Sequence, residues 1–571
     1  MHVDKITRRH GDRVYVSHVI RSSYREGGKV KHDQVANISR LPAHLIEVIS
    51  RGLAGESVGV LSEAVSVEQS WLHGHVAAVL GTARRMDMAK VLDAKPSRQR
   101  DLVLGMIVAR VLDPASKLAT TGFFGTTTLG KTLGIEGATE DELYGAMDWL
   151  LERQEKIERR LAKRYLEPGG VVLYDLTSVY VEGEHCELAQ RGYSRDGKPG
   201  HLQIEFGLMT NAAGEPVAIE AFPGSTGDPK TFPAQVTKVQ DRFGVKDVIW
   251  VGDRGMVTSA QVRMLEKIAG LSWVTALRAP SIRQLLEQGS LQLSLFDTQN
   301  LAEVTDPRFP GERLVICHNP VMESERARKR EELLQATERE LAKVAAMAAR
   351  AASGRGRLRG EAKIGERVGR VVNKYNMAKH FRRVVTAKSF SFERDEGSIA
   401  EEAKLDGFYV IRTNVKPDRL STAAVVETYK SLEQVERAFR HFKLQGLQVR
   451  PIYHRLDRRV RAHLLICMLA YSVQRRMEQD LAPLLFMDED VPARADPVAP
   501  AGRSQHAQHK DQCKRTQDGY PIHSFRALLK ELECVVRNRI RIHGTEADIE
   551  VTTRRTPLQA RAFQLLGVSA S

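Results

Sequence analysis

Two carboxylates stand where an ordinary solvated acid is not expected. Asp175 lies inside the apolar run VVLYDLTSVYV (171–181), which has the pattern of a β-strand. An ionised side chain there costs free energy unless it is paired or bound to a metal ion. Asp253 follows the apolar run DVIWV (247–251), in the glycine-flanked segment VGDRGM, where α/β sheets place reactive groups. Taken singly, each is also explained as a strand-end or turn residue.

A third carboxylate, Glu436, belongs to a helix predicted over 421–444. Tyr429, Glu436 and Lys443 are spaced seven and seven residues apart, which is two helical turns each with a drift of about 20°. The three side chains would therefore share one helix face. Glu433 is the competing acid, and the alternative for Glu436 is a solvated residue paired along its own helix.

Together the three acids have the composition of a site for hard divalent cations, which prefer oxygen ligands and need few protein groups. Two ions held by three carboxylates would support in-line attack on a phosphodiester, by activating the attacking hydroxyl and stabilising the leaving oxygen. The expected cofactor is therefore Mg²⁺, as two ions, with Mn²⁺ as a possible substitute.

The elements that must position these acids have the order of a mixed α/β sheet. Helical patterns separate the later strands, as in sheets that contain parallel pairs. The strand patterns cover 171–181, 202–210, 215–222, 247–251, 272–277 and 408–414.

Charge and cysteine content narrow the class of protein. Among 571 residues the 86 basic side chains exceed the 71 acidic ones, and the net charge of +15 favours a polyanionic partner such as nucleic acid. No two of the five cysteines form a C-x-x-C pair, which argues against a disulfide scaffold or a cysteine zinc site. The N-terminus lacks an apolar segment, and the longest apolar stretch, 463–473, is too short to span a bilayer. We therefore expect a soluble, cytoplasmic protein, associated with the nucleoid when bound to DNA.

Five segments, in order, carry a resemblance to a known family: YDLTS, GYSRDGKPGHLQIEFGL, AFPGSTGDPKTF, VGDRGM and YKSLEQVERAFRHFK. They resemble the DDE transposases of bacterial insertion sequences, in the type-four insertion-sequence superfamily and its IS1634-like branch. The resemblance covers about 170–475 well and 1–165 more weakly. It implies an α/β fold: a ribonuclease H-like catalytic core (a mixed sheet flanked by helices) interrupted by an insertion domain, with N-terminal β-rich and helical domains.

The resemblance assigns roles to individual residues. The family's two aspartates match Asp175 and Asp253, and its glutamate matches Glu436, as catalytic and metal-binding residues. The signature Tyr-x2-Arg-x3-Glu-x6-Lys matches Tyr429 and Lys443, but its arginine position is Leu432 here, which puts in doubt any phosphate contact by that arginine.

A basic track follows Glu436. Between 437 and 461 lie eight basic residues and one acidic residue, which suggests a surface for the DNA backbone. Asp228 is expected to cap the helix after it. The residues expected to contact DNA are Tyr429, Arg440, Lys443, Arg450, Arg455, Arg458 and Arg459.

The sequence also suggests a division into domains. End recognition is assigned to the part before 165, and a flexible linker is expected from composition near the C-terminus. The expected segments are a β-rich region (1–66), a helical DNA-binding region (67–170), the first part of the core (171–280), the insertion domain (281–405), the second part of the core with the glutamate helix (406–480), the linker (481–522) and a C-terminal helical tail (523–571), which includes a helix at 525–540.

The function implied is that of a transposase, which binds the ends of its insertion sequence and catalyses metal-dependent DNA cleavage and strand transfer. The expected partners are double-stranded DNA and a second copy of the chain, because two ends must be held together. Two alternatives remain at this point: a catalytically idle DNA-binding descendant of a transposase, and a nuclease with the same core.

Overall fold

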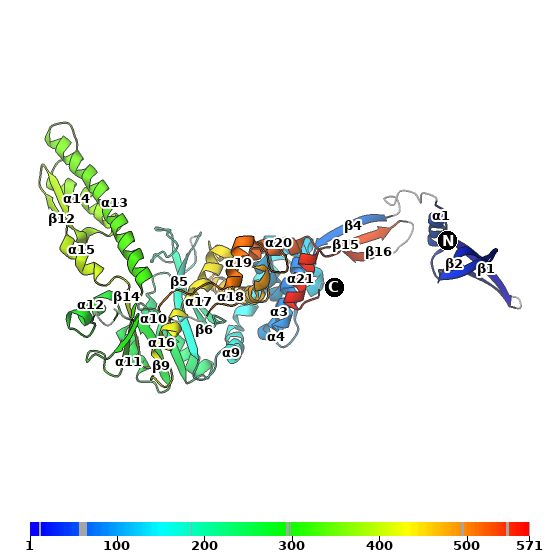
Figure 1. Cartoon of the computed structure of the whole chain (residues 1–571), viewed down its shortest axis with the longest axis horizontal. Helices are drawn as coiled ribbons and strands as arrows, with labels where there is room; N and C mark the ends of the chain where they lie inside the picture. Colours follow the sequence, from blue (N-terminus) through cyan, green and yellow to red (C-terminus); the bar gives the residue numbers. More distant parts are fainter. Residues whose placement is uncertain are drawn as a thin grey trace.

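An eight-stranded mixed sheet forms the centre of the protein (Figure 1). The computed structural model describes residues 1–10, 13–55, 65–183, 185–292, 296, 299–492, 496–543 and 548–569. The sheet order is β10-β11-β14-β9-β8-β5-β6-β7, with β8 parallel to both β5 and β9 and the other neighbours antiparallel. The predicted mixed sheet is therefore confirmed. The predicted strands are β5 (Val171–Tyr180), β6 (Gln203–Asn211), β7 (Pro216–Pro223), β8 (Val248–Val251), β9 (Leu271–Ala276) and β14 (Phe408–Thr413).

Apolar layers cover both faces of this sheet. Tyr174 and Leu176 of β5 pack into one layer with the helices on their side, and Leu173 and Val179 pack into the other. Strand alternation therefore places Asp175 on the second face. Helices of the first layer are α9 (Gln154–Tyr165), α10 (Asp228–Thr237), η1 (Lys238–Arg242) and α11 (Ser259–Leu265); those of the second include α16 (Thr422–Lys430), α17 (Glu433–Arg440), η4 (His441–Gln445) and α18 (Asp457–Asp480).

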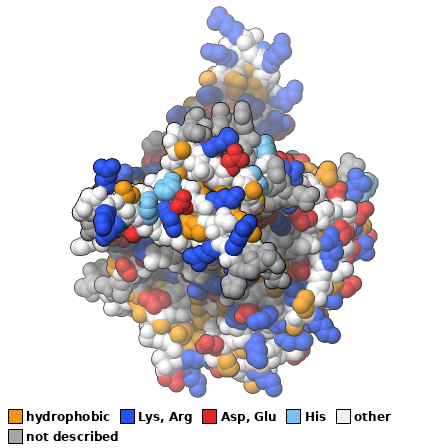
Figure 2. Space-filling view, turned by 90° about the vertical axis from the view of Figure 1, so that its right-hand side faces the viewer, with side chains coloured by type: hydrophobic (Ala, Val, Ile, Leu, Met, Phe, Trp, Pro, Cys, Tyr) orange, Lys and Arg blue, Asp and Glu red, His pale blue; other side chains and the backbone are white. Residues whose placement is uncertain are grey.

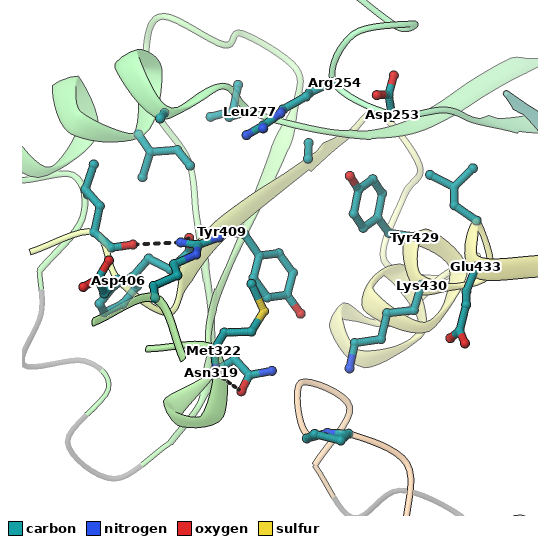
Figure 3. Close-up of a pocket in the computed structure, with 18 of the residues that line it drawn as sticks. Asp253, Arg254, Leu277, Asn319, Met322, Asp406, Tyr409, Tyr429, Lys430 and Glu433 are labelled. Atoms are coloured by element: carbon teal, nitrogen blue, oxygen red, sulfur yellow. Dashed lines mark hydrogen bonds between the residues drawn. The ribbon is translucent and has the colours of Figure 1, made fainter. Parts of the chain in front are cut away.

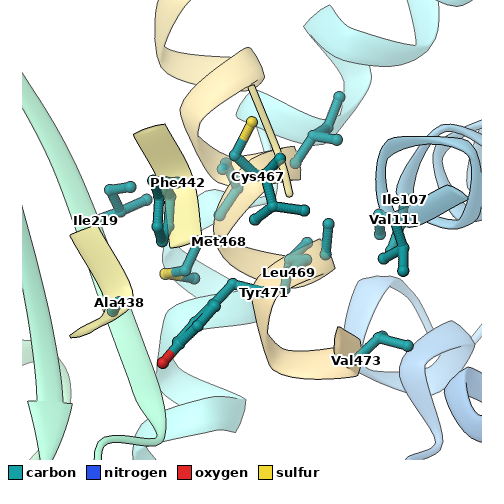
Figure 4. Close-up of a cluster of buried hydrophobic side chains, with 14 of the residues drawn as sticks. Ile107, Val111, Ile219, Ala438, Phe442, Cys467, Met468, Leu469, Tyr471 and Val473 are labelled. Carbon is teal, nitrogen blue, oxygen red and sulfur yellow. The ribbon is translucent and has the colours of Figure 1, made fainter. Parts of the chain in front are cut away.

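The helical region before the sheet shares its core with the second face. Figure 4 shows Ile107 and Val111 of α5 in the same cluster as Ile219 of β7 and Met468 of α18. These helices are therefore part of the body that carries the sheet, and removal of 1–165 would expose its core. The elements are β4 (Val65–Leu72), α3 (Gly74–Arg85), α4 (Met88–Leu92), α5 (Arg98–Leu112), α6 (Lys117–Thr126), α7 (Leu129–Leu133) and α8 (Glu140–Leu151).

The C-terminal residues fold back onto this region, and the predicted helix at 525–540 is wrong in its second half. Helix α20 (Phe525–Glu533) ends early, and β15 (Val536–Ile542) pairs with β4 and with β16 (Asp548–Thr552) in a three-stranded sheet. The sequence VRNRIRI alternates between apolar and polar residues, which suits a strand better than a helix. The chain closes with α21 (Pro557–Leu566), whose Phe563 is buried.

The predicted flexible linker is wrong over most of its length. Residues 493–495 lie outside the described part, but the flanks contain η5 (Ala482–Leu484) and α19 (Gln505–Cys513). Lys510 is 1% exposed, pairs with Glu489 and donates to the carbonyl oxygens of Ala482 (2.9 Å) and Met487 (3.2 Å). The ion pair and hydrogen bonds of this buried lysine order a segment whose composition alone suggests flexibility.

The predicted insertion at 281–405 divides into two parts. Its first part contains β10 and β11, which belong to the central sheet; its second part has an apolar cluster of its own. Figure 1 shows α13 and α14 projecting from one end of the molecule. The elements are α12 (Ala279–Glu287), β10 (Leu301–Val304) and β11 (Arg313–His318), then α13 (Pro320–Ala352), α14 (Glu361–Tyr375), η3 (Ala378–His380), β12 (Phe381–Val385), β13 (Phe390–Arg394) and α15 (Glu396–Ala403).

At the opposite end lies a small N-terminal module (Figure 1). Three antiparallel strands and one helix form it, in agreement with the predicted β-rich start. Residues 56–64, which connect it to β4, lie outside the described part. Its elements are β1 (His2–His10), β2 (Arg13–Glu26), β3 (Lys29–Asn37) and α1 (Ala43–Leu53).

The contact between the C-terminus and α3 predicts a sharp effect at one glycine. A Cβ atom at Gly74 would overlap the carbonyl oxygen of Leu532 and lie 2.7 Å from Cβ of Val535. We expect Gly74→Ala to lower the free energy of unfolding by about 1–3 kcal/mol, because the close-packed neighbours cannot move freely. Gly145, inside α8, has no atom within 4 Å of such a Cβ, so Gly145→Ala should raise stability by up to about 1 kcal/mol.

Chemical denaturation of the two variants and the parent chain measures both effects. Equal stability of Gly74→Ala and the parent would show that α20 and the turn after it do not pack on α3 as described.

Candidate functional site

Asp175 occupies a central strand and is largely shielded from water. Its Oδ1 accepts a hydrogen bond from the backbone N–H of Leu176, at 2.8 Å. The pKa of Asp175 is raised to about 7, first because burial disfavours the charged form and then because the Asp253 carboxylate lies near; Arg195 opposes the shift, and Glu436 adds to it. The Asp175 carboxyl therefore lies near two other carboxylates, and a bound cation would reduce the repulsion among them.

Asp253 lies just past the end of the neighbouring strand. In the parallel pairing of β5 with β8, Leu173 is opposite Val251, the last residue of β8, so Asp175 and Asp253 each lie two residues beyond this pair. Oδ1 of Asp253 accepts hydrogen bonds from the backbone N–H groups of Gly255 (2.9 Å) and Met256 (2.7 Å). The loop backbone therefore fixes one carboxylate oxygen and leaves the other for a ligand.

Glu436 comes from α17, and the predicted continuous helix over 421–444 is wrong. Helix α16 ends at Lys430 and α17 begins at Glu433, with a tight turn between them in which the Ser431 hydroxyl donates to the carbonyl of Thr428 (2.6 Å). Phe439 anchors α17 to the sheet by an edge-to-face contact with Phe206, at 5.6 Å between ring centroids. Glu436 itself is exposed toward the sheet edge where the two aspartates lie.

The three acids line one hollow of about 350 Å³. A larger cavity of about 1020 Å³ adjoins it and shares Asp253 and Glu436. Figure 3 shows Tyr429 and Glu433 on the same side of this larger cavity as Asp253. The pKa of Tyr429 is raised to about 12, first by burial and then by the charge of Asp253. The other residues that line the smaller hollow are Leu176, Thr177, Arg195, Asp228, Phe439, Arg440, Lys443 and Leu444.

Two of the predicted DNA contacts are held inside the protein. Lys443 donates to the hydroxyl of Thr177 (2.6 Å) and to Asp196 (2.9 Å), and Arg450 pairs with the same carboxylate at 2.6 Å. The Asp196 side chain is 1% exposed. Burial lowers the pKa of Lys443, against the attraction of Asp196. Their first role in the structure is therefore to neutralise a buried acid beside the hollow.

The remaining predicted cations differ in their surroundings. Arg440 lines the hollow and is exposed, and Arg455 is exposed and makes no ion pair with the part of the chain that the structure describes. Arg458 pairs with Asp148 at 3.3 Å, and Arg459 lies over the ring of Tyr144, 4.1 Å from its centroid. The basic track is thus not a uniform row of free charges.

Sequence reasoning missed an arginine at the hollow and misjudged Asp228. Arg195 donates to both oxygens of Asp228, at 2.7 and 2.9 Å, and also pairs with Glu205. Asp228 is the first residue of α10 and makes no side-chain cap, so the predicted capping role is wrong. The segment GYSRDGKPGH did offer a signal for Arg195, because it places two neighbouring charged residues in a glycine-rich loop. The acidic partners of Arg195, however, lie 10 and 33 residues away in the sequence.

The donor set fits a hard divalent cation. Three carboxylates from separate elements line the hollow, and the fourth, Asp228, is engaged by Arg195. Among the described residues no group of three or more His, Cys, Asp or Glu side chains is already arranged to hold an ion. Ligation of one ion by all three acids therefore requires a rearrangement of their side chains.

A mixed sheet with one acid in β5, a second just after β8 and a third on a following helix defines a class of metal-dependent phosphodiester enzymes. Residues 167–473, more than half of the chain, match the family described as "Transposase DDE domain". Residues 3–57 match the family described as "IS1634 family transposase, N-terminal domain". The chain belongs to the DDE transposases, in the IS1634 family, and so is an enzyme of DNA cleavage and strand transfer.

Solved structures of transposases are also similar to this chain. A piggyBac transposase synaptic complex with hairpin DNA shares 8% identity, with a TM-score of 0.34 over 80% of this chain and 76% of that one. A Mos1 transposase paired-end complex with the left transposon end shares 13% identity, with a TM-score of 0.14 over 34% and 62%. No curated protein gives a sequence match.

Helix α18 accounts for the longest apolar stretch of the sequence. Most of its residues are buried against the helices around it. Of the helices in the described part, none has the length and apolarity to cross a membrane.

The surroundings of Arg450 and Arg455 predict opposite consequences for the same substitution. Arg450→Gln should lower the free energy of unfolding by about 1–3 kcal/mol, because it removes a partner of the buried Asp196. Arg455→Gln should leave stability unchanged within about 0.5 kcal/mol, yet reduce the slope of log affinity for DNA against log salt by about 1.

Denaturation curves and binding titrations at several salt concentrations separate the two effects. An unchanged salt slope for Arg455→Gln would remove Arg455 from the DNA-binding surface.

Proposed function

We propose that Asp175, Asp253 and Glu436 are the catalytic residues of this transposase and that they hold two Mg²⁺ ions, for which Mn²⁺ can substitute. The observation that carries the proposal is their convergence: acids far apart in the sequence, from β5, the loop after β8 and α17, line one hollow. When bound, divalent ions lower the pKa of water and neutralise charge on a phosphodiester.

The chain's own residues prepare the hollow for a phosphodiester. Backbone N–H groups orient both aspartates, so their free oxygens are fixed before substrate arrives. Arg440 is an exposed cation at the rim, suited to bind a DNA phosphate. Water attack at an element end frees a 3′-hydroxyl, and that hydroxyl then attacks the target strand, with no covalent enzyme intermediate.

The architecture we infer for this function is a ribonuclease H-like core with an insertion. Strands β7, β6 and β5 form an antiparallel meander, followed by parallel β8 and β9. In the sequence, the segment from α13 to α15 lies between these strands and the helices α16 and α17. It has an apolar cluster of its own. We assign Tyr429 to DNA contact from its position beside Asp253 in the larger cavity.

The N-terminal module is the proposed reader of the element ends. Basic side chains are exposed on its strands, and Figure 2, which views the molecule from this end, shows Lys and Arg side chains spread over the face. A module that projects from the body can reach DNA beyond the hollow. Because two ends must be joined, we propose that the working form on DNA is a homodimer. The exposed basic residues include Lys5, Arg8, Arg9, Arg25 and Lys29.

Neutral variants of the acids test the catalytic assignment. Asp175→Asn, Asp253→Asn and Glu436→Gln should each abolish cleavage of element-end DNA with Mg²⁺, because an amide of the same shape binds divalent ions poorly. Their affinity for uncut DNA should stay within about threefold of the parent, since the amide keeps the shape and the DNA contacts lie elsewhere.

Glu433→Gln is the matched control, because Glu433 is exposed on the same helix and lines the larger cavity but not the hollow of the three acids. It should cleave at close to the parent rate. Full cleavage by any one of the three acid variants would exclude that residue from the site.

Removal of residues 1–55 tests the assignment of end recognition. The truncated chain keeps β4 and the shared core, so it should fold and bind DNA in a salt-sensitive manner. Its preference for the end sequences of its element over scrambled DNA, about 10³-fold or more for a typical specific binder, should fall to near one.

Competition binding on the two DNA sequences measures this ratio. A preserved preference would move recognition to another element, such as the projecting helices α13 and α14.

A further inference from the structure

An aromatic and basic surface lies beside the acid hollow and is not used by the mechanism above. Tyr193 is 77% exposed and Tyr453 is 66% exposed, which makes them the most exposed of the Phe, Tyr and Trp side chains that the structure describes. Leu444, at 67%, is exposed at the rim of the hollow itself.

The loop that carries Tyr193 is built into the fold. A Cβ atom at Gly192 would overlap the carbonyl oxygen of Gly224, and one at Gly224 would overlap the carbonyl oxygen of Gln203. The backbones at 192 and 224 therefore approach so closely that only glycine fits. The N–H of Arg195 also donates to the Ser178 hydroxyl, at 2.8 Å. The loop is fixed to the sheet, so its exposed side chains are held in place.

Cations accompany the rings on this surface. The guanidinium of Arg195 lies 5.9 Å from the ring centroid of Tyr193, and Lys198 lies 5.8 Å from that of Tyr180. His201 makes an edge-to-face contact with the same Tyr180 ring, at 5.6 Å. Such pairs combine a flat face for stacking with positive charge for a phosphate.

Two backbone contacts join Tyr453 to this surface. The N–H of Ile452 donates to the carbonyl of Tyr180 (3.2 Å), and the N–H of Glu182 donates to the carbonyl of Ile452 (3.0 Å). Tyr453 therefore lies next to the end of β5, five residues beyond Asp175. Arg195 connects this surface to the acid hollow, because its side chain also lines that hollow.

We propose that Tyr193, Tyr453 and Lys198 form a binding site for single-stranded DNA, on which unpaired bases next to the cut phosphodiester stack. Base pairs inside a duplex bury their faces against their neighbours, so an exposed tyrosine ring stacks on an unpaired base rather than on the interior of a duplex. The inference deepens the proposed function, since it rests on the acid hollow as the place where DNA is cut. The proposal identifies the side chains that hold the DNA strand on one side of the acid hollow.

The test uses the full-length chain, with magnesium omitted so that no strand is cut. The probes are a fluorescent single-stranded oligothymidine of about 12 nucleotides, which spans one site, and a blunt duplex of random sequence. The double variant Tyr193→Ala with Tyr453→Ala should weaken oligothymidine binding about tenfold or more, because two bases lose the rings on which they stack. Duplex binding should change by less than about twofold, because no charge is removed.

Two matched controls accompany this variant. Replacement of both tyrosines by phenylalanine keeps the rings and should keep oligothymidine affinity. Phe486 is also exposed, at 42%, with Lys514 over its ring at 5.1 Å, but lies on another element. Phe486→Ala should leave both affinities unchanged.

Equal weakening on both probes would mean a general backbone contact and would overturn the stacking proposal, as would no weakening on either. The assay does not depend on cleavage. An acid variant that still cleaves would refute the catalytic assignment alone, whereas unchanged oligothymidine binding would refute the stacking site alone.

Discussion

The structure is organised around the cost of crowding carboxylates at one edge of a buried sheet. Asp175 is held on a central strand with Asp253 beside it, and burial, followed by the charge of Asp253, raises the pKa of Asp175. Backbone N–H groups hold the two aspartates in place, and Arg195 and Lys443 neutralise the acids around them. A site of this kind favours cation binding, because without a cation the repulsion between its carboxylates costs free energy.

The rest of the fold keeps that edge fixed. Helix α17 brings Glu436 to the hollow and is pinned by Phe439 on the sheet, while α18 joins the same apolar cluster to the N-terminal helices. The C-terminal strand β15 pairs with β4, so distant parts of the chain close around one core. The N-terminal module and the segment from α13 to α15, by contrast, project from opposite ends of the molecule (Figure 1).

Much of the core could be predicted because its strands are apolar runs with clear boundaries. The sheet strands followed from that pattern, and the parallel register of β5 with β8 explains why Asp175 and Asp253 lie near each other. Other features depend on contacts that sequence spacing does not reveal. Lys510 finds carbonyl partners more than 20 residues away and orders a segment of loose composition. Arg195 pairs with Asp228, which therefore does not cap its helix. Asp196 pairs with Lys443 and Arg450, two cations that were expected to face DNA.

We propose that three acids from separate elements form one cation site. Anomalous X-ray diffraction from crystals grown with Mn²⁺ at neutral pH tests this site, because each bound ion appears as a peak independent of the atomic coordinates. We expect anomalous peaks within ligand distance, about 2.0–2.4 Å, of carboxylate oxygens of Asp175 and Asp253, with Glu436 turned to contact an ion. Ions bound elsewhere, with this hollow empty of anomalous signal, would contradict it.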